Sequence, residues 1–325
     1  MSCKNEKMWV SLLHLGMNMW TDPDAPVPEG GPYVGNSYYS RKLRCDRDVW
    51  TEVTNYMPTV GLNTILIDIG EAVIYDSHPE LAIEGSWTPD ELKAELARLR
   101  SIGLEPLPKL NFSACHDAWL GEYSKMVSSK IYLDVVRDLI NEVCEIFDKP
   151  RYFHLGMDEE TWDHQSRYGY CVVRGEKLWW HDLLYMVDIC EKNGARAWVW
   201  SDYYWHHPEV FVKNMPKTVV QSNWGYGRMP AKDASGRYPA QYVQTYVDFA
   251  KLGYDQIPTS STWSWTGNTD ETVRLFVREN MVNENLLGFM TAPWQATEAQ
   301  HRFRLLEDTE RLGAAKKLYF GGCCK

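Results

Sequence analysis

Residues 88–110 read TPDELKAELARLRSIGLEPLPKL, and this stretch decides the fold. It opens with Thr88 as a helix N-cap, Pro89 at the first helical position and Glu91 as the glutamate of a capping box, so a helix begins here. Gly103 supplies the left-handed residue at which such a helix ends. The apolar run that follows is typical of a strand buried on both faces. The order helix, glycine, strand predicts one unit of a parallel α/β array.

The same unit recurs along the chain. Gly61, Gly194 and Gly253 also stand between an amphipathic segment and a short apolar run. Eight strands alternating with eight helices predict the α/β class and a (β/α)8 TIM barrel. The expected strands are 9–15, 63–69, 104–110, 152–157, 196–201, 217–223, 256–262 and 287–293. The expected helices are 46–57, 88–101, 129–147, 175–193, 206–214, 238–251, 269–282 and 298–319.

The 325 residues exceed the roughly 250 of a typical TIM barrel. No linker, low-complexity tract or charge block marks a second domain, so we expect a single domain over residues 1–325. The additional length falls in long βα loops, which lie on the face where barrel active sites are built. These loops are 16–45, 70–87, 111–128, 158–174 and 224–237.

Composition narrows the class of partner. The net charge of −10 is spread along the chain without a basic cluster, which argues against a nucleic-acid binder. The chain has 15 Trp and 19 Tyr against 9 Phe, and such rings stack on sugar faces while donating hydrogen bonds at their edges. We therefore expect a carbohydrate as the partner. The pattern says nothing of the oligomeric state.

Cysteine spacing and the N-terminal residues bear on the compartment. The eight cysteines, at 3, 45, 115, 144, 171, 190, 323 and 324, form no CxxC pair or metal spacing, so buried free thiols are expected. No apolar signal region precedes the first strand and no run reaches membrane-spanning length. The cytoplasm is the favoured location; a trimmed chain from a secreted or periplasmic protein would have the same sequence.

Functional side chains follow nearly every predicted strand. Adjacent carboxylates, Asp158 and Glu159, follow the fourth strand, and these are the expected catalytic pair. Carboxyl groups beside tryptophans are typical of sugar cleavage, which needs acid and base groups and flat apolar walls. The expected substrate-binding residues are Asp68, Glu71, Asn111, His116, Trp200, Asp202, Trp224, Trp263, Trp265 and Trp294. His154, within the strand, is expected to be a core histidine.

The segment from His154 to Glu159, HLGMDE, resembles the strand-four motif His-hydrophobic-Gly-Gly-Asp-Glu of family 20 glycoside hydrolases, the β-N-acetylhexosaminidases. Upstream, the stretches HPEL, GSW, GL, PLPKLN and CH are similar to the family's Tyr-Pro-x-Leu, Gly-Ala-Trp, Gly-Ile, Pro-Glu-Ile-Asp and Pro-Gly-His series in the same order. The resemblance is good over residues 63–160 and loose beyond them.

The resemblance implies a substrate-assisted retaining mechanism that cleaves a terminal sugar without a cofactor. Glu159 would be the general acid/base, and Asp158 would orient the 2-acetamido group of the substrate. His116 and Asp68 would support sugar hydroxyls or the acid. Repulsion and burial of two adjacent carboxyl groups would raise at least one pKa, which keeps a proton available near neutral pH.

The chain also departs from the family pattern. The family's strand-one arginine has no counterpart in residues 13–18, Lys109 and Asn111 replace a Glu and an Asp, and Met157 replaces the second glycine. Strand eight carries Trp294 and Gln295 without the Glu of the family's Trp-x-Glu, and residues 1–325 do not include the α/β domain that commonly precedes the barrel. These changes bear on the preference for N-acetylhexosamine.

Other readings remain open. The acidic run 158–160 could cap the following helix, because carboxylates favour helix N-termini. A metal site from His14, His116, Asp68 and Asp202 is conceivable, but no HxH or HExxH spacing occurs and none is predicted. The alternatives in function are a glycosidase of different sugar selectivity, with Asp158 or Asp202 as a protein nucleophile, and a non-catalytic carbohydrate-binding barrel. The run Gly225-Tyr226-Gly227 is interpreted as a flexible active-site loop.

Overall fold

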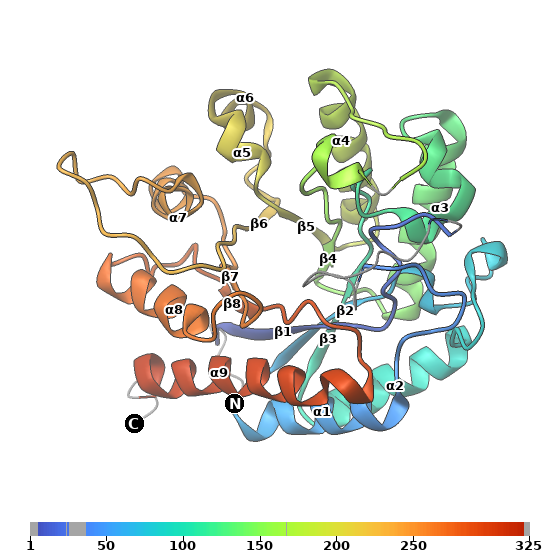
Figure 1. Ribbon diagram of the computed structural model, residues 1–325, viewed down its shortest axis with the longest axis horizontal. Helices are drawn as coiled ribbons and strands as arrows, with labels where there is room; N and C mark the ends of the chain where they lie inside the picture. The colour runs from blue at the N-terminus through green and yellow to red at the C-terminus, as the bar shows by residue number, and fades with distance from the viewer. Residues whose placement is uncertain (1–5, 24, 26–36, 167, 322–325) are drawn as a thin grey trace.

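In a computed structural model, which describes residues 6–23, 25, 37–166 and 168–321, eight parallel strands form one sheet with the order β6-β5-β4-β3-β2-β1-β8-β7. Figure 1 shows helices arranged around these strands. The strands are β1 (Met8–His14), β2 (Thr64–Asp68), β3 (Glu105–Lys109), β4 (Tyr152–His154), β5 (Arg196–Trp200), β6 (Val220–Ser222), β7 (Thr259–Ser260) and β8 (Gly288–Thr291). The predicted (β/α)8 TIM barrel is confirmed.

The ring of strands closes between β6 and β7 through short contacts. Isolated parallel bridges pair Gln221 with Gln256 and Trp224 with Thr259. The backbone N–H of Ile257 donates to the carbonyl of Gln221 at 2.9 Å. Closure at this point brings the ends of all eight strands around one opening.

The barrel interior is filled by alternate residues of the strands, because successive side chains point to opposite faces. On β1, Met8, Val10 and Leu12 belong to the inner apolar cluster, whereas Trp9 and Leu13 belong to the outer one. The inner cluster also contains aromatic residues from the later strands, so the interior is a packed core below the opening. Its buried members are Met8, Val10, Leu12, Leu66, Leu107, Tyr152, Trp198, Trp200, Val220, Trp224, Ile257, Met290 and Ala292.

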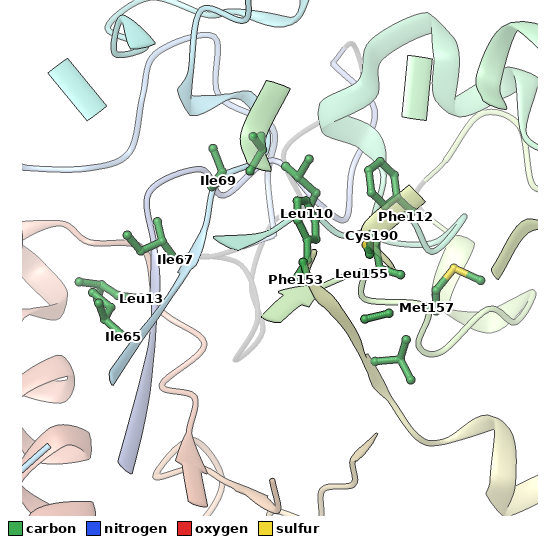
Figure 2. Close-up of a cluster of buried hydrophobic side chains, with 14 of the residues drawn as sticks. Leu13, Ile65, Ile67, Ile69, Leu110, Phe112, Phe153, Leu155, Met157 and Cys190 are labelled. Carbon is green, nitrogen blue, oxygen red and sulfur yellow. The ribbon is translucent and has the colours of Figure 1, made fainter. Parts of the chain in front are cut away.

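A second apolar cluster lies between the strands and the helices. Figure 2 shows it along β1 to β4, from Leu13 and Ile65 to Phe153, Leu155 and Met157. The helices that cover it present apolar faces at helical spacing. They are α1 (Arg47–Thr59), α2 (Pro89–Ser101), α3 (Lys130–Ile146), α4 (Glu176–Lys192), α5 (Tyr203–His206), α6 (Pro208–Asn214), α7 (Gln241–Leu252), α8 (Asn268–Arg278) and α9 (Arg302–Phe320).

Helix boundaries follow the local sequence signals. The Thr88 side chain accepts from the backbone of Glu91, whose carboxylate accepts from the Thr88 N–H, so the capping box is present. The glycines expected to end helices at 61, 103, 194 and 253 all have positive φ. The helix expected over 206–214 is instead two, α5 and α6, because Pro208 disfavours helical backbone at His207 before it.

The structure also bears on the cysteines and on membranes. Cys115, Cys144 and Cys190 are buried free thiols as expected, and Cys45 and Cys171 are free but only partly buried. Cys3, Cys323 and Cys324 lie outside the described residues. Within the described ranges, no helix combines the length and apolar character needed to cross a bilayer.

Ser222 offers a test of how the barrel is closed. Its hydroxyl accepts from the buried indole N–H of Trp198 at 2.7 Å and donates to the carbonyl of Ile257 at 2.7 Å, which joins β5 and β6 to the segment that leads into β7. Ser222→Ala leaves the indole N–H unpaired, so the free energy of unfolding should fall by roughly 1–3 kcal/mol. Urea denaturation measures the change. Ser101→Ala, at an exposed helix end, is the control and should stay within about 0.5 kcal/mol of wild type; equal values for both variants would contradict the assignment.

Candidate active site

A cavity of about 430 Å³ opens at the C-terminal ends of the strands. Its lining comes from residues at or just after the ends of β3 to β8 and from the loops that follow β1, β3 and β4. A barrel places its active site at this face. The lining residues are Met19, Trp20, Ser37, Asn111, His116, Asp158, Glu159, Asp163, His164, Ser166, Trp200, Trp224, Tyr226, Trp263 and Trp294.

The chain leaves β4 in a left-handed conformation. The expected strand 152–157 ends at His154, since Gly156, Met157 and Glu159 have φ values of 73°, 71° and 53°. A Cβ on Gly156 would lie 1.9 Å from the side-chain oxygen of Asn111, so glycine is required there for space as well as for φ. This turn directs the next two side chains into the cavity.

The carbonyl groups of the turn are also held. Cys115 Sγ lies 3.3 Å from the carbonyl oxygen of Asp158 and 3.1 Å from that of Glu159. Burial raises the pKa of the Cys115 thiol to about 12, so its S–H is available to donate. The Ser113 hydroxyl also donates to the Asp158 carbonyl. The backbone of the acidic pair is therefore fixed from the β3 side.

Asp158 is a buried carboxylate. Its Oδ1 accepts from the Asn111 amide at 3.0 Å and lies 3.1 Å from His116 Nδ1. Burial raises the pKa of Asp158, but the charge and contact of His116, with help from Lys109 and Asn111, outweigh it and lower the pKa to about 2. Asp158 is therefore ionised across the physiological range.

Glu159 has the opposite tendency. Burial and the neighbouring Asp158 charge raise its pKa, while His116 and His164 lower it by less. Its Oε2 lies 3.6 Å from His116 Nε2 and 3.5 Å from His164 Nε2. Its backbone N–H donates to Asp202 Oδ2 at 2.7 Å. Glu159 is thus the group of the pair that retains a proton to higher pH.

His116 bridges the two acids. Burial lowers the pKa of His116, but the charge of Asp158 outweighs this and holds the pKa well above its ordinary value. The imidazole and the two carboxylates offer ligand atoms within 4.8 Å of one another. An imidazolium already supplies the cation between the two acids, so we assign no metal to this group. The four-residue metal set weighed from the sequence is not a cluster in the described part of the chain.

Glu160 turns away from the cavity and pairs with Arg174. The guanidinium Nη2 lies 2.6 Å from Glu160 Oε2, and Nη1 lies 3.1 Å from Asp182 Oδ2 on α4. Arg174 also donates to the carbonyl of Phe112 at 3.0 Å. The acidic run therefore does not cap α4, whose N-cap is Gly175; it is anchored by a buried ion pair.

Below the cavity, charged groups pair across the inner face of the barrel. Lys109 Nζ donates to Asp68 Oδ2 at 2.5 Å, and His14 Nδ1 lies 3.3 Å from the same oxygen. Lys109 is wholly buried, and its ammonium outweighs burial and holds the pKa of Asp68 below its usual range. Burial and Lys109 hold the pKa of His154 well below its usual range, and this residue is buried, as expected of a core histidine.

The part of the cavity lining that comes from the ends of β5 to β8 is aromatic. The Trp200 ring centroid lies 5.5 Å from that of Trp224 and 5.8 Å from that of Trp294. Tyr226 lies 6.5 Å from Trp263 and 6.3 Å from Trp294. These five rings are neighbours, and such rings can stack on the apolar faces of sugars.

The structure brings most of the predicted site residues together. Those that line the cavity are Asn111, His116, Asp158, Glu159, Trp200, Trp224, Trp263 and Trp294. Four others do not line it. Asp68 pairs with Lys109, Asp202 accepts from the backbone of Glu159, and Glu71 accepts from the N–H groups of Met17 and Asn18. Trp265 packs under the Arg228 guanidinium at 4.9 Å.

Sequence reasoning missed several lining residues. Trp20, Asp163 and His164 lie in loops without periodic pattern, so only their chemistry could have drawn attention to them. Tyr226 lies in the segment interpreted as an active-site loop, and that glycine-flanked position was the available signal.

Comparison with known proteins supports the fold. No protein-family model matches the chain, and no curated protein matches it by sequence. Among solved structures, the GH20 exo-β-N-acetylglucosaminidase from Vibrio harveyi, in complex with N-acetylglucosamine, matches with a TM-score of 0.63 and 13% identity, covering 94% of this chain and 54% of that one. The chain thus spans about half the length of that enzyme.

Two further solved structures agree. The β-N-acetylhexosaminidase from Bacteroides fragilis gives a TM-score of 0.61 at 15% identity, over 98% of this chain and 71% of its own. The GH20 β-N-acetylhexosaminidase from Streptomyces coelicolor gives 0.60 at 15% identity, over 98% and 70%. The chain therefore has the catalytic-barrel fold of GH20 β-N-acetylhexosaminidases, as the sequence resemblance implied.

The turn at Gly156 can be tested against a glycine with the same backbone demand. Gly156→Ala must displace Asn111 and loosen its bond to Asp158, whereas at Gly103, with φ of 91°, an added Cβ meets nothing within 4 Å. Gly103→Ala should cost roughly 1–2 kcal/mol from backbone strain. Gly156→Ala should cost a further 1–3 kcal/mol or so from the clash. Chemical denaturation of both variants measures the difference, and equal losses would refute the close approach.

Proposed function

We propose that this protein is a glycoside hydrolase that removes a terminal sugar bearing a 2-acetamido group. The observation that carries the proposal is the pair Asp158 and Glu159, adjacent in sequence and lining one aromatic-walled cavity with opposite pKa shifts. One group is kept ionised and the other tends to keep its proton. This division of roles is what acid-catalysed glycoside cleavage requires. Neither role needs a cofactor.

In the proposed reaction, Glu159 donates its proton to the glycosidic oxygen as the bond from that oxygen to the anomeric carbon breaks. The acetamido carbonyl oxygen of the substrate attacks the anomeric carbon, and the Asp158 carboxylate stabilises the positive charge that develops on the acetamido nitrogen. A water oxygen then attacks the anomeric carbon as the bond from that carbon to the acetamido oxygen breaks, which regenerates the 2-acetamido group. Glu159 takes the proton from the water as the base, and this restores the acid. The described lining residues include no Lys or Arg, which suits a neutral sugar.

A protein nucleophile is less well supported. Asp158 and Asp202 were the candidates. For Asp202, burial, together with the charges of Asp158 and Glu159, raises the pKa well above the usual range. Its Oδ2 already accepts the Glu159 N–H, and it does not line the cavity. A protonated carboxyl is a poor nucleophile. We assign Asp202 the role of positioning Glu159.

A panel of nitrophenyl glycosides tests the proposal through Glu159. Glu159→Gln should lower kcat/KM for an N-acetylhexosaminide by roughly 10²–10⁴-fold, since a general acid contributes that much. The loss should shrink for a dinitrophenyl leaving group, which departs without a proton. Glu122→Gln, at an exposed carboxyl, is the control and should retain wild-type activity. Sugar binding without turnover of any glycoside would instead identify a non-catalytic barrel.

Asp158 provides a second, independent test. Because its charge raises the Glu159 pKa, Asp158→Asn should lower that pKa at every pH at which His116 remains protonated. The alkaline limb of kcat/KM, where Glu159 loses the proton needed for the first step, should then move to lower pH. Activity on the 2-acetamido substrate should also fall, by roughly 10²-fold or more. Asp188→Asn, exposed on α4, serves as the control. Cleavage confined to sugars without the acetamido group would reject substrate assistance.

A further inference from the structure

His164 lines the cavity and contacts Glu159 from a partly exposed position. Its Nε2 lies 3.5 Å from Glu159 Oε2, and its side chain is 46% exposed. His116, the other imidazole near this oxygen, is buried. The Glu159 carboxyl is therefore placed between a buried imidazole and a half-exposed one.

Hydrogen bonds within the loop hold His164 in this position. Its Nδ1 lies 2.7 Å from Thr161 Oγ1, and the N–H of Thr161 donates to the carbonyl of Glu159 itself at 2.7 Å. The next residue, Gln165, is buried and exchanges two side-chain hydrogen bonds of 2.6 Å with the backbone of Val172. These contacts fix the 3₁₀ turn η4 (Asp163–Gln165) against the acid.

The contacts are compatible with a ring proton on Nε2. Thr161 Oγ1 accepts from the backbone N–H of His164 at 3.4 Å, and its own hydroxyl proton can be donated to Nδ1. A hydroxyl that donates to Nδ1 leaves the ring proton on Nε2, which faces Glu159. A neutral ring then presents an N–H dipole to the carboxyl, and a protonated ring presents a full charge. Both stabilise the carboxylate form of Glu159.

We propose that His164 is a positioning residue. It stabilises the Glu159 carboxylate that is left when the acid gives its proton to the leaving group. The inference rests on the proposed function for its role in turnover, but the contact itself does not. In the cycle, Glu159 must be an acid first and a base second, and His164 supports the second state from the side open to solvent.

Other groups near Glu159 also affect its protonation state. Asp158 and burial favour the protonated acid, and His116 favours the carboxylate. Asp202 binds the backbone N–H of Glu159, and the Tyr226 hydroxyl, whose pKa is raised well above its usual value chiefly by burial, stays neutral. Loss of His164 therefore removes a stabiliser of the carboxylate and leaves the rest in place, so the Glu159 pKa should rise.

The experiment measures the Glu159 pKa directly, without turnover. Carboxyl-labelled glutamate is introduced, the Glu159 resonance is assigned by its loss in Glu159→Gln, and its pH titration is followed by ¹³C NMR. In His164→Phe the midpoint should move up by about 0.5 pH unit, a modest shift because the ring is partly exposed. Thr161→Val should raise the Glu159 midpoint by less than His164→Phe does. Thr161→Ser, which keeps the hydroxyl, should leave the midpoint at the wild-type value. His206→Phe, at an exposed position of α5, should leave it unchanged.

The pH dependence of kcat/KM gives the second readout, in which the alkaline limb of His164→Phe should move up with the NMR midpoint. A shifted midpoint in a protein that cleaves no glycoside would uphold the inference for His164 and reject the proposed function. An active wild type whose Glu159 midpoint is the same in His164→Phe and Thr161→Val would overturn the inference and leave the proposed function intact.

Discussion

The conformation of the site depends on one buried ion pair, between Glu160 and Arg174. A guanidinium removed from water is costly unless its donors are paired, and this one is satisfied by Glu160, Asp182 and the Phe112 carbonyl. The pair joins Glu160, the residue after Asp158 and Glu159, to Arg174 near the end of the same loop. Arg174 in turn contacts Asp182 on α4. Because Glu160 without Arg174 would be a buried charge that has lost its cation, at a cost of several kcal/mol, the loop has one favoured path. Asp158 and Glu159 precede that anchor directly, so their direction into the cavity follows from it.

Given that path, two neighbouring carboxyl groups acquire different chemistry from their surroundings. Asp158 has an amide and an imidazolium in contact with its oxygen. Glu159 has longer contacts with two imidazoles and receives the repulsion of Asp158. A single proton shared between the pair is therefore held on Glu159. The two acids need no separation along the chain to differ in role, because the groups that distinguish them come from the β3–α3 loop on one side and from η4 on the other.

Much of the fold and part of the site could be predicted from sequence. Apolar runs and helix-ending glycines gave all eight strands, because buried parallel strands and helix C-termini have strong local signatures. The rule that functional groups follow strand ends located Asp158, Glu159 and His116. The rule could not show that Asp68, unlike these residues, does not line the cavity. Asp68 pairs with Lys109, and that contact depends on the pairing register of β2 and β3. His164 was missed for a related reason. Its contact with Glu159 depends on the conformation of a loop fixed by Gln165 and Arg174, and such a loop has no periodic pattern in the sequence.

Chain order also explains how the cavity wall is divided. Apart from Met19 and Trp20, the lining residues that follow β1, β3 and β4 are polar, whereas those from the ends of β5 to β8 are aromatic. Because β4 pairs with β5, the carboxyl groups that follow β4 border the aromatic side of the cavity at Trp200. Under the proposed function, a sugar stacked on Trp200, Trp224 or Trp294 would lie in the same cavity as Asp158 and Glu159. With Asp68 already paired to Lys109, the polar contacts left for such a sugar are concentrated on the side where the bond is broken. Recognition of the ring would then rest on shape and stacking, and recognition of the reacting centre on charge.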